Sequence, residues 1–219
     1  MRPARSRSST LPVASEDPPE GLDESSRFDW AFERLLPPSV QAKSEIYWTP
    51  VAVIRKAMEM LAPQPPRYVL DVGSGPGKFC ILASLMLDAQ FVGIERKRRL
   101  VTIAQHAARE VNASRTRFIC GNALNHDWSG FDVIYFYNPF QELSWEDPSR
   151  AEDGYELYQR YALAAKRKLA TLAVGTRVLL YHGLGCEMPD GYSYVKAHSF
   201  GLGHLELWIR TGELDARAA

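Results

Sequence analysis

The sequence predicts an α/β fold built on a doubly wound, mostly parallel, seven-stranded sheet with an antiparallel β-hairpin at its end. Short apolar segments alternate with segments of helical periodicity between residues 67 and 182, which is typical of parallel strands connected by helices. The last two apolar segments, 192–200 and 205–210, are separated only by the short connection 201–204, which predicts the hairpin. A chain of 219 residues that is 46% hydrophobic can bury one well-packed core of this kind.

Periodicity and flanking turn residues place each element of this pattern. Five strands are expected in the alternating part, at 67–72, 90–95, 116–120, 131–137 and 176–182. The helices between them are expected at 77–87, 97–112 and 153–172. In the last helix, aromatic and aliphatic side chains recur at helical spacing, and we interpret them as core residues: Tyr158, Tyr161, Ala162, Ala165, Leu169 and Leu172.

The segment before the sheet divides into two parts. Residues 1–26 are rich in Ser, Pro, Arg and Glu, and we expect them to form a disordered tail. Residues 27–64 are expected to form an N-terminal helical segment, whose first helix lies within 27–36. Thr49 is the expected N-cap of its second helix, because a threonine followed by proline is a frequent helix start. The main domain is then expected to span residues 65–215.

Composition limits the classes of protein and partner. The formal net charge is zero, so the whole chain lacks the basic excess that is typical of nucleic-acid-binding proteins. The three cysteines are far apart and odd in number, which argues against a disulfide framework and favours a reducing, cytoplasmic location. No apolar stretch reaches the roughly 18 residues that a membrane span needs. No cluster of His and Cys indicates a metal site.

A glycine-rich turn follows the first strand. The strand ends at Asp71, and Gly73, Gly75 and Gly77 then alternate up to the next helix. Glycine suits this turn because it adopts positive φ angles and lets the backbone approach a ligand closely. The first amides of the new helix lack partners within the helix and face that ligand. The second strand ends at Glu95, 24 residues after Asp71, where an acid can accept hydrogen bonds from both hydroxyls of a ribose.

This arrangement resembles the first motif of class I S-adenosylmethionine-dependent methyltransferases. The glycine pattern is G-x-G-x-G, whereas a dinucleotide-binding fingerprint has the pattern G-x-G-x-x-G. The resemblance implies that S-adenosyl-L-methionine is the cofactor, bound by Asp71, by the three glycines and, at its ribose, by Glu95. After the third strand, Asn122 and Ala123 stand where the family often has Asp-Ala. This implies that Asn122 accepts a hydrogen bond from the adenine amine, although an asparagine that stabilises a turn is an equal alternative.

The chain departs from that family before its hairpin. Family members usually carry a helix there, but residues 183–191 are few and rich in glycine. We therefore expect a trimmed sheet domain that lacks the last helix of the family.

A second candidate motif follows the fourth strand, where Asn138, Pro139 and Phe140 stand at the expected carboxyl edge of the sheet. They resemble the Asn/Asp-Pro-Pro-aromatic motif of methyltransferases that modify amino nitrogens, although this chain has one proline. The resemblance implies a catalytic site at these three residues, with Asn138 also against the cofactor. Asn138 would accept a hydrogen bond from the amine, and Phe140 would stabilise developing positive charge. The alternative is a strand that stops at a proline.

The segment that precedes the main domain favours a protein substrate. Glu45, Tyr47 and Thr49 resemble a Glu-x-Tyr-x-x-Thr-like segment of non-SET histone lysine methyltransferases, which folds over the cofactor. The resemblance implies that segment 27–64 forms a cofactor lid and that Tyr47 and Thr49 contact the cofactor. Alternatively, these residues cap the helix and pack. The acidic stretch 141–153 would attract a cationic substrate, unless its acids form only a solvated loop.

These observations predict an enzyme that transfers a methyl group to an amino nitrogen, with a protein lysine favoured and a small-molecule or nucleobase amine as the alternative. An NAD(P)-binding oxidoreductase and a noncatalytic cofactor-binding module are more distant alternatives. The basic run 96–99 would suit a 2′-phosphate of NADP, but Glu95 argues against it. His182 and Tyr181 are the candidate general bases, and a structural role for His182 is the alternative. No metal, membrane or strong nucleic-acid interaction is expected.

Overall fold

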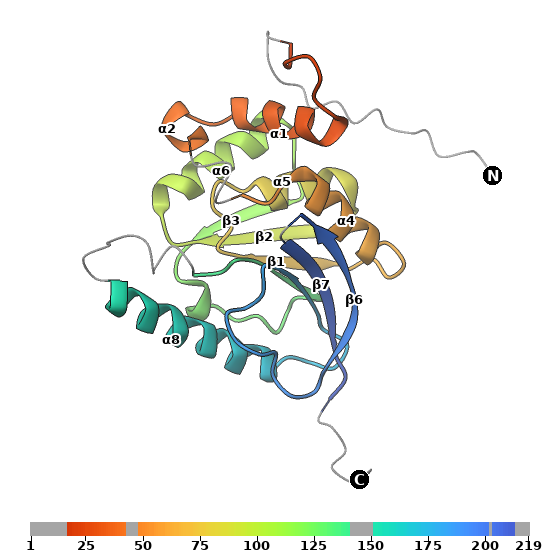
Figure 1. Cartoon of the computed structure of the whole chain (residues 1–219), viewed down its shortest axis with the longest axis vertical. Coiled ribbons are helices and arrows are strands. Elements are labelled where there is room, and N and C mark those ends of the chain that lie inside the picture. Colours follow the sequence, from red (N-terminus) through yellow and green to blue (C-terminus); the bar gives the residue numbers. More distant parts are fainter. Residues whose placement is uncertain (1–16, 43–47, 141–150, 202, 213–219) are drawn as a thin grey trace, which may run out of the picture.

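A computed structural model describes residues 17–42, 48–140, 151–201 and 203–212, without the side chains of 151–153. Its centre is a seven-stranded sheet with the strand order β3-β2-β1-β4-β5-β7-β6 (Figure 1). The first five strands are parallel, and β7 pairs antiparallel with both β5 and β6. The strands are β1 (Tyr68–Val72), β2 (Gln90–Glu95), β3 (Thr116–Cys120), β4 (Val133–Tyr137), β5 (Arg177–Tyr181), β6 (Tyr192–Phe200) and β7 (Gly203–Arg210).

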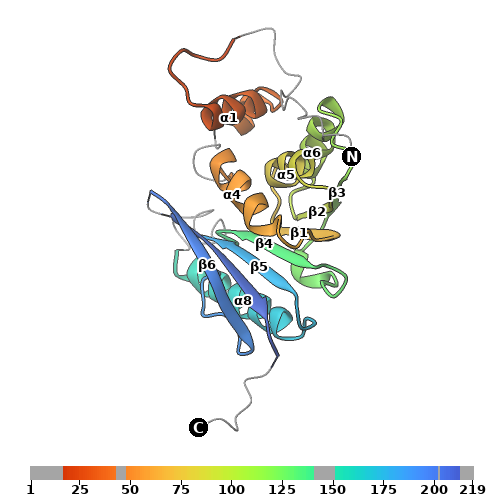
Figure 2. The same cartoon turned by 90° about the vertical axis from the view of Figure 1, so that its right-hand side faces the viewer.

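Helices cover both faces of the sheet. Helices α4, α5 and α6 lie on one face with α1 beyond α4, and α8 lies on the other face (Figure 2). A short 3₁₀ turn, η1, follows β3 on the α8 side. The helical elements are α1 (Glu24–Arg34), α2 (Pro38–Gln41), α4 (Val51–Leu61), α5 (Lys78–Met86), α6 (Arg98–Glu110), η1 (Ala123–Asn125) and α8 (Ala151–Ala170).

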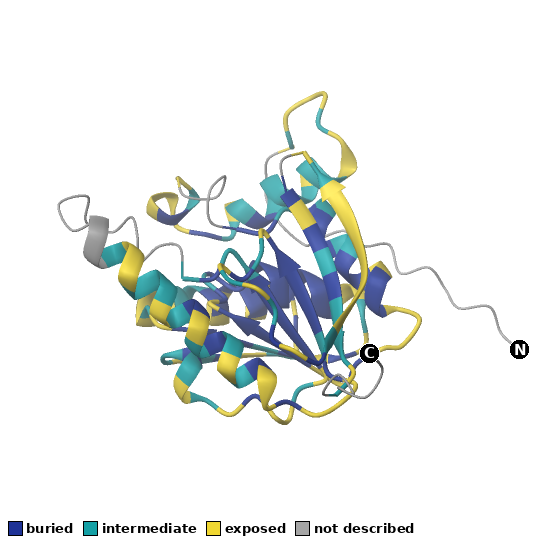
Figure 3. Ribbon diagram, turned by 60° about the horizontal axis from the view of Figure 1, so that its bottom comes forward, coloured by how far each residue is buried: buried dark blue, intermediate teal, exposed yellow. Residues whose placement is uncertain are grey.

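The two layers of helices bury two separate hydrophobic cores. Side chains alternate between the faces along each strand, so Val133 and Tyr135 of β4 join the core under α4 and α5. Ile134 and Phe136, which alternate with them, join the core under α8. The central strands are therefore buried on both faces, whereas the edge strand β6 is exposed (Figure 3).

The strand order creates a crevice at the carboxyl edge of the sheet. From β1 the chain builds outward through β2 to β3 on one side, and it then crosses over to β4 on the other side. The connections after β1 and β4 therefore leave in opposite directions. In open α/β sheets, ligands bind at this kind of switch point.

The predicted fold class is confirmed, including the parallel strands, the terminal hairpin and the absence of a last helix. Every expected strand and every expected helix between strands is present, with bounds that differ by no more than two residues. Residues 183–191, all described, contain no helix before the hairpin. No helix of the described residues is both long and apolar enough to cross a bilayer.

The start of α4 differs from the prediction. Pro50 occupies the N-cap position without a side-chain hydrogen bond, so the predicted N-cap role of Thr49 is wrong. The hydroxyl of Thr49 lies 2.7 Å from the hydroxyl of Tyr135 instead. Asp29 of α1 takes over the capping, because its carboxylate accepts a hydrogen bond of 3.0 Å from the amide of Val51. A residue distant in sequence therefore supplies the cap.

Helix α1 begins earlier than expected, at Glu24 rather than within 27–36. The carboxylate of Asp23 accepts a hydrogen bond of 2.7 Å from the amide of Ser26, which is the usual N-cap contact. The helix therefore includes residues that the sequence assigns to a disordered tail.

Candidate functional site

The glycine-rich turn between β1 and α5 has the backbone conformation expected from its sequence. Gly73, Gly75 and Gly77 have φ angles of 82°, 54° and 86°, a region that residues with a side chain rarely adopt. A Cβ added to Gly77 would come within 2.6 Å of the ring of Phe118. Apart from the adjacent residues of the chain, no atom lies within 4 Å of a Cβ placed at Gly73 or Gly75, so these two glycines border open space. The turn can therefore accept a ligand directly against its backbone.

Glu95, at the end of β2, is held by two backbone amides. One carboxylate oxygen accepts a hydrogen bond of 3.1 Å from Gly75, and the other accepts one of 2.7 Å from Lys97. The residue is only 6% exposed, yet it lines a cavity. These contacts favour an ionised carboxylate at the boundary between the glycine turn and α6.

Asp71, at the end of β1, is buried beside Cys80. The Cys80 thiol lies 3.5 Å from the Asp71 carboxylate and donates to it. Burial raises the pKa of Asp71 to about 7, the thiol contact works in the opposite direction, and the charge of Glu95 adds a smaller increase. Asp71 therefore titrates near neutral pH in the ligand-free protein. It lies outside the lining of the cavity described next.

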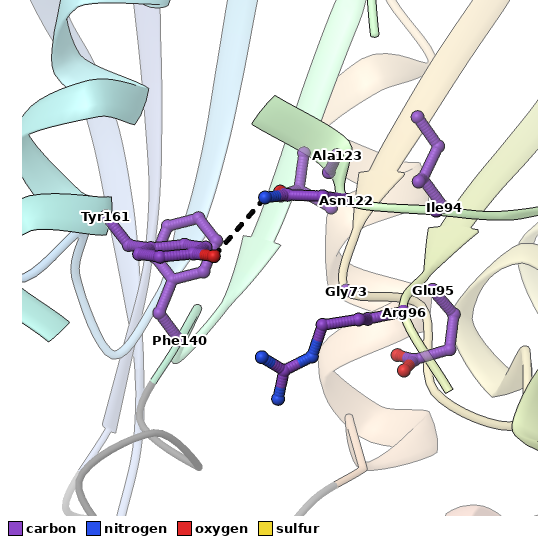
Figure 4. Close-up of a pocket in the computed structure, with 10 residues that line it drawn as sticks. Gly73, Ile94, Glu95, Arg96, Asn122, Ala123, Phe140 and Tyr161 are labelled. Atoms are coloured by element: carbon purple, nitrogen blue, oxygen red, sulfur yellow. Dashed lines mark hydrogen bonds between the residues drawn. The ribbon is translucent and has the colours of Figure 1, made fainter. Parts of the chain in front are cut away.

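A cavity opens at the carboxyl edge of β1, β2 and β3 (Figure 4). It brings together four residues that the sequence predicts as cofactor contacts, namely Gly73, Glu95, Asn122 and Ala123, and it also includes Phe140. The remaining lining residues are Val72, Ile94, Arg96, Gly121 and Tyr161. Arg96, the first residue of the basic run 96–99, stands beside Glu95 at the wall of this cavity.

Asn122 uses both ends of its side-chain amide. The amide oxygen accepts a hydrogen bond of 3.0 Å from the backbone of Leu124, which caps η1. The amide nitrogen donates to the hydroxyl of Tyr161 at 3.3 Å (Figure 4). Asn122 therefore both stabilises the turn and lines the cavity.

Tyr161 is a cavity residue that sequence reasoning missed. It belongs to α8, where its spacing matches that of buried Ala162, Ala165 and Leu169, and the sequence therefore assigned it to the core. The structure instead leaves it partly exposed, with its ring edge-on to Phe140 at 5.3 Å between centroids. Helical periodicity contains no signal that separates a cavity wall from a core position.

The Asn138-Pro139-Phe140 segment has a strained backbone. Asn138 and Phe140 have φ angles of 44° and 68°, and Pro139 between them is buried. The amide of Asn138 donates to the carbonyl of Tyr181 at 3.0 Å, which fixes the segment to the end of β5. Left-handed conformations of non-glycine residues are costly and cluster at functional sites. His182, after β5, shares this feature with a φ of 64°.

Three rings gather at the carboxyl ends of β4 and β5. Tyr137 and Tyr181 stack at 5.2 Å, and the His182 ring lies 4.2 Å from Tyr181 and 5.8 Å from Tyr137. Burial, with a smaller effect of Tyr181, raises the pKa of Tyr137 to about 12, and burial also raises the pKa of Tyr181. Partial burial and the nearby His204 lower the pKa of His182. These rings are therefore uncharged at neutral pH.

Several predicted site residues are not in the cavity. The lining does not include Gly75, Gly77, Asn138 or Pro139. It does not include Thr49 either, which is buried against Tyr135. Tyr47, Glu45 and the acidic residues of 141–150 lie outside the described residues. Across the described ranges, no group of three or more His, Cys, Asp or Glu side chains is placed to hold a metal ion.

One segment of the chain matches a known protein family. Residues 67–155 match the family described as "Methyltransferase domain", and this range contains the glycine turn, Glu95, Asn122 and Asn138. This segment of the chain is therefore similar to a methyltransferase domain. The matched segment covers the part of the sheet that forms the cavity.

Solved structures share the fold of this chain. An RNA methyltransferase from Salinibacter ruber, solved in complex with S-adenosyl-L-homocysteine, superimposes with a TM-score of 0.56 at 24% identity. The match covers 77% of this chain and 97% of that chain. TrmN from Thermus thermophilus has a TM-score of 0.55 at 22% identity and covers 74% of this chain and 49% of that chain. At these identities the similarity establishes the fold.

One curated relative is more similar in sequence over a shorter range. The 23S rRNA (uracil(1939)-C(5))-methyltransferase RlmD of Acidithiobacillus ferrooxidans is 40% identical over 67 residues. The match covers 30% of this chain and 15% of the relative. The chain therefore corresponds to a small part of that protein.

Proposed function

We propose that the protein is a methyltransferase that uses S-adenosyl-L-methionine and transfers the methyl group to an amino nitrogen. The observation that carries the proposal is the cavity in which Gly73, Glu95 and Asn122 meet, within a segment that matches a methyltransferase domain. The neighbour from Salinibacter ruber, which has the same fold, binds S-adenosyl-L-homocysteine, the demethylated form of this cofactor.

The residues around the cavity fit the proposed cofactor. The open space over Gly73 and Gly75 suits a ligand that lies against the backbone. The Glu95 carboxylate is the acceptor for the ribose hydroxyls, and Asn122 with Ala123 borders the adenine. Asp71 stays close to the turn as a carboxylate that a cationic ligand would ionise. A bound cofactor of this kind supplies a methyl group that is already activated as a sulfonium.

The protein then contributes to the reaction by aligning the acceptor nitrogen with the methyl group. The lone pair of a neutral amine forms a bond to the methyl carbon, the bond from carbon to sulfur breaks, and its electron pair stays on sulfur. The nitrogen becomes positively charged and releases a proton to solvent. Phe140 lines the cavity, and Asn138 lies two residues before it, just after β4. We propose Asn138 as the hydrogen-bond acceptor for this nitrogen and Phe140 as its aromatic face. Their strained backbone conformation supports a functional role.

A protein lysine remains our favoured acceptor. The uncharged rings of Tyr137, Tyr181 and His182 offer apolar and aromatic surface next to Asn138 without positive charge, which suits an alkyl amine. The other two arguments for lysine, from the segment around Tyr47 and from the acidic stretch 141–153, rest on sequence alone.

An exocyclic amine of a nucleobase is the second candidate. The 40% identity to an rRNA methyltransferase over 67 residues, and the fold shared with an RNA methyltransferase, favour RNA as the substrate class. The named target of the first relative is the C5 carbon of uracil, so the choice of an amine rests on Asn138 and Phe140. The zero net charge of the chain is therefore not sufficient to exclude RNA as the substrate.

Incubation of the protein with methyl-labelled S-adenosyl-L-methionine and a fractionated lysate tests the proposal. We expect label in a fraction that resists nuclease, is lost on proteolysis and maps to lysine. Label that resists protease and is lost on nuclease treatment would move the acceptor to RNA or DNA. Label only in small molecules would reject both macromolecular acceptors. Absence of cofactor binding in calorimetry, together with binding of NADPH, would overturn the methyltransferase assignment.

A further inference from the structure

The hydroxyl of Tyr161 stands at the wall of the cavity with a defined hydrogen-bonding polarity. Its helix, α8, packs on the opposite face of the sheet from the glycine-turn helix α5, yet its ring reaches the cavity beside Phe140 (Figure 4). Tyr161 of α8 therefore contacts Asn122, which follows β3, and Phe140, which follows β4. What the hydroxyl can offer a ligand depends on its contact with Asn122.

The orientation of the Asn122 amide follows from its neighbours. The backbone amide of Leu124 can only donate, so the end of the Asn122 side chain that faces it at 3.0 Å must be the oxygen. The other end is then the NH₂ group, and it faces the Tyr161 hydroxyl at 3.3 Å. An NH₂ group can only donate here, so the Tyr161 oxygen is the acceptor. This contact therefore does not use the proton of the Tyr161 hydroxyl.

An aspartate at position 122 would reverse this polarity. A carboxylate cannot donate, so it would accept the hydroxyl proton of Tyr161 and direct it away from the cavity. The asparagine therefore keeps the tyrosine as a hydrogen-bond donor toward a ligand. The Asn122 oxygen, with two lone pairs and one bond to Leu124, also retains capacity to accept.

We infer that Tyr161 and Asn122 together read the adenine ring, with the Tyr161 hydroxyl donating to a ring nitrogen and the Asn122 oxygen accepting from the exocyclic amine. The inference rests on the proposed function and assigns Tyr161 as a residue that selects the base of the cofactor. Hypoxanthine is the informative competitor, because it carries a hydrogen on the ring nitrogen beside a carbonyl in place of the amine. The Tyr161 hydroxyl would then face an N–H group, and the Asn122 oxygen would face a carbonyl oxygen, so neither contact is complementary.

Calorimetry with S-adenosylhomocysteine and its hypoxanthine counterpart, S-inosylhomocysteine, tests this inference without turnover. The variant Tyr161→Phe keeps the ring against Phe140 and removes only the hydroxyl. We expect it to bind S-adenosylhomocysteine about 3- to 10-fold more weakly, as for one net hydrogen bond, and to discriminate less between the two ligands. The matched control is Tyr155→Phe on the same helix, an exposed ring whose hydroxyl accepts only from Gln159 in the described contacts, and it should bind as the wild type does.

A double-mutant cycle tests the polarity itself. Asn122→Asp should weaken S-adenosylhomocysteine binding, and Tyr161→Phe should then cause little further loss, because the aspartate has already recruited the hydroxyl proton. Wild-type affinity in Tyr161→Phe, equal losses for both ligands, or additive losses in the double variant would each overturn the inference. These results differ from a failure of the proposed function, in which the wild-type protein binds neither ligand.

Discussion

The carboxylate of Glu95 joins the glycine turn to the start of α6 through two charge-assisted hydrogen bonds. The variant Glu95→Gln preserves the shape of the side chain but removes its charge and one acceptor. We expect it to weaken S-adenosylhomocysteine binding by about 10- to 100-fold, since hydrogen bonds to charged groups contribute roughly 1.5–3 kcal/mol. Calorimetry measures the change, and Glu110→Gln at the exposed end of α6 is the control. Unchanged affinity in Glu95→Gln would remove Glu95 from the cofactor site.

Asp71 is expected to make the stability of the ligand-free protein depend on pH. Its pKa of about 7 in the fold lies above the ordinary value of 3.8, so the folded state binds more protons than the unfolded state between these values. The contribution of Asp71 to stability therefore falls as pH rises from about 4 to 7, and the penalty is complete above 7. Asp71→Asn avoids it and should stabilise the protein by about 1–3 kcal/mol at pH 8, with little gain at pH 4.

Urea unfolding of the two proteins at pH 4, 6 and 8 measures this dependence. The exposed acid Asp88 is the control position, and Asp88→Asn should leave the pH profile unchanged. Two results would contradict the prediction. One is a gain in stability from Asp71→Asn that does not increase between pH 4 and pH 8, and the other is a loss of stability in Asp71→Asn at pH 8.

Asn138 combines a side chain proposed for catalysis with a left-handed backbone, and two substitutions separate these properties. Asn138→Gly removes the amide and accepts a φ of 44° without strain, whereas Asn138→Ala removes the amide and adds strain of about 1 kcal/mol. We expect both variants to lose turnover by roughly 10-fold or more, with cofactor affinity unchanged and stability reduced only in Asn138→Ala. Full activity of Asn138→Gly on the identified acceptor would show that the backbone, and not the amide, is what the site requires.

At the scale of elements, α1 is fixed to the sheet domain by Asp29. This carboxylate caps α4 at Val51 and pairs with the ammonium of Lys78, the first residue of α5. Lys78 is 4% exposed and lies at a helix N-terminus, where the helix dipole disfavours a positive charge. Asp29 therefore neutralises an otherwise unfavourable cation next to the glycine turn, and it ties three helices together.

The variant Asp29→Ala tests this role of α1. It leaves Lys78 buried without its carboxylate and removes the cap of α4, so we expect a loss of about 3–5 kcal/mol in the free energy of unfolding. Glu24→Ala in the same helix breaks an exposed ion pair with Arg55 and should cost less than about 1 kcal/mol. Chemical denaturation compares the two. Similar small losses in both variants would mean that Asp29 does not anchor α1.

At the scale of the whole molecule, the sheet order gathers the ends of four strands at one edge. Ligand binding there should stabilise the whole fold by mass action. S-adenosylhomocysteine at 100 times its Kd should add about 2.7 kcal/mol, which corresponds to a rise in Tm of roughly 5–10 °C for a chain of this size. NADPH at the same concentration is the control and should produce no rise. A larger shift with NADPH would favour the oxidoreductase alternative.

Local sequence determined the elements and the backbone of the site. Alternating apolar segments placed all the strands, because strand and helix periodicities differ within a few residues. The φ angles of Gly73, Gly75 and Gly77 follow from the residue type itself. Glu95 and Asn122 were found because parallel strands bring their carboxyl ends to one edge, so a polar residue after each strand has a predictable place.

Tertiary structure decided which side chains complete the site. Tyr161 contacts Asn122 in the cavity, 39 positions away in the sequence, and Asp29 caps α4 at Val51, 22 positions away. Neither contact follows from periodicity. The predicted cap at Thr49 failed for the same reason, since the Tyr135 hydroxyl offered that threonine a buried partner. A short polar side chain bonds whichever group folding brings within reach, so its partner is a property of the packed molecule and not of its neighbours in sequence.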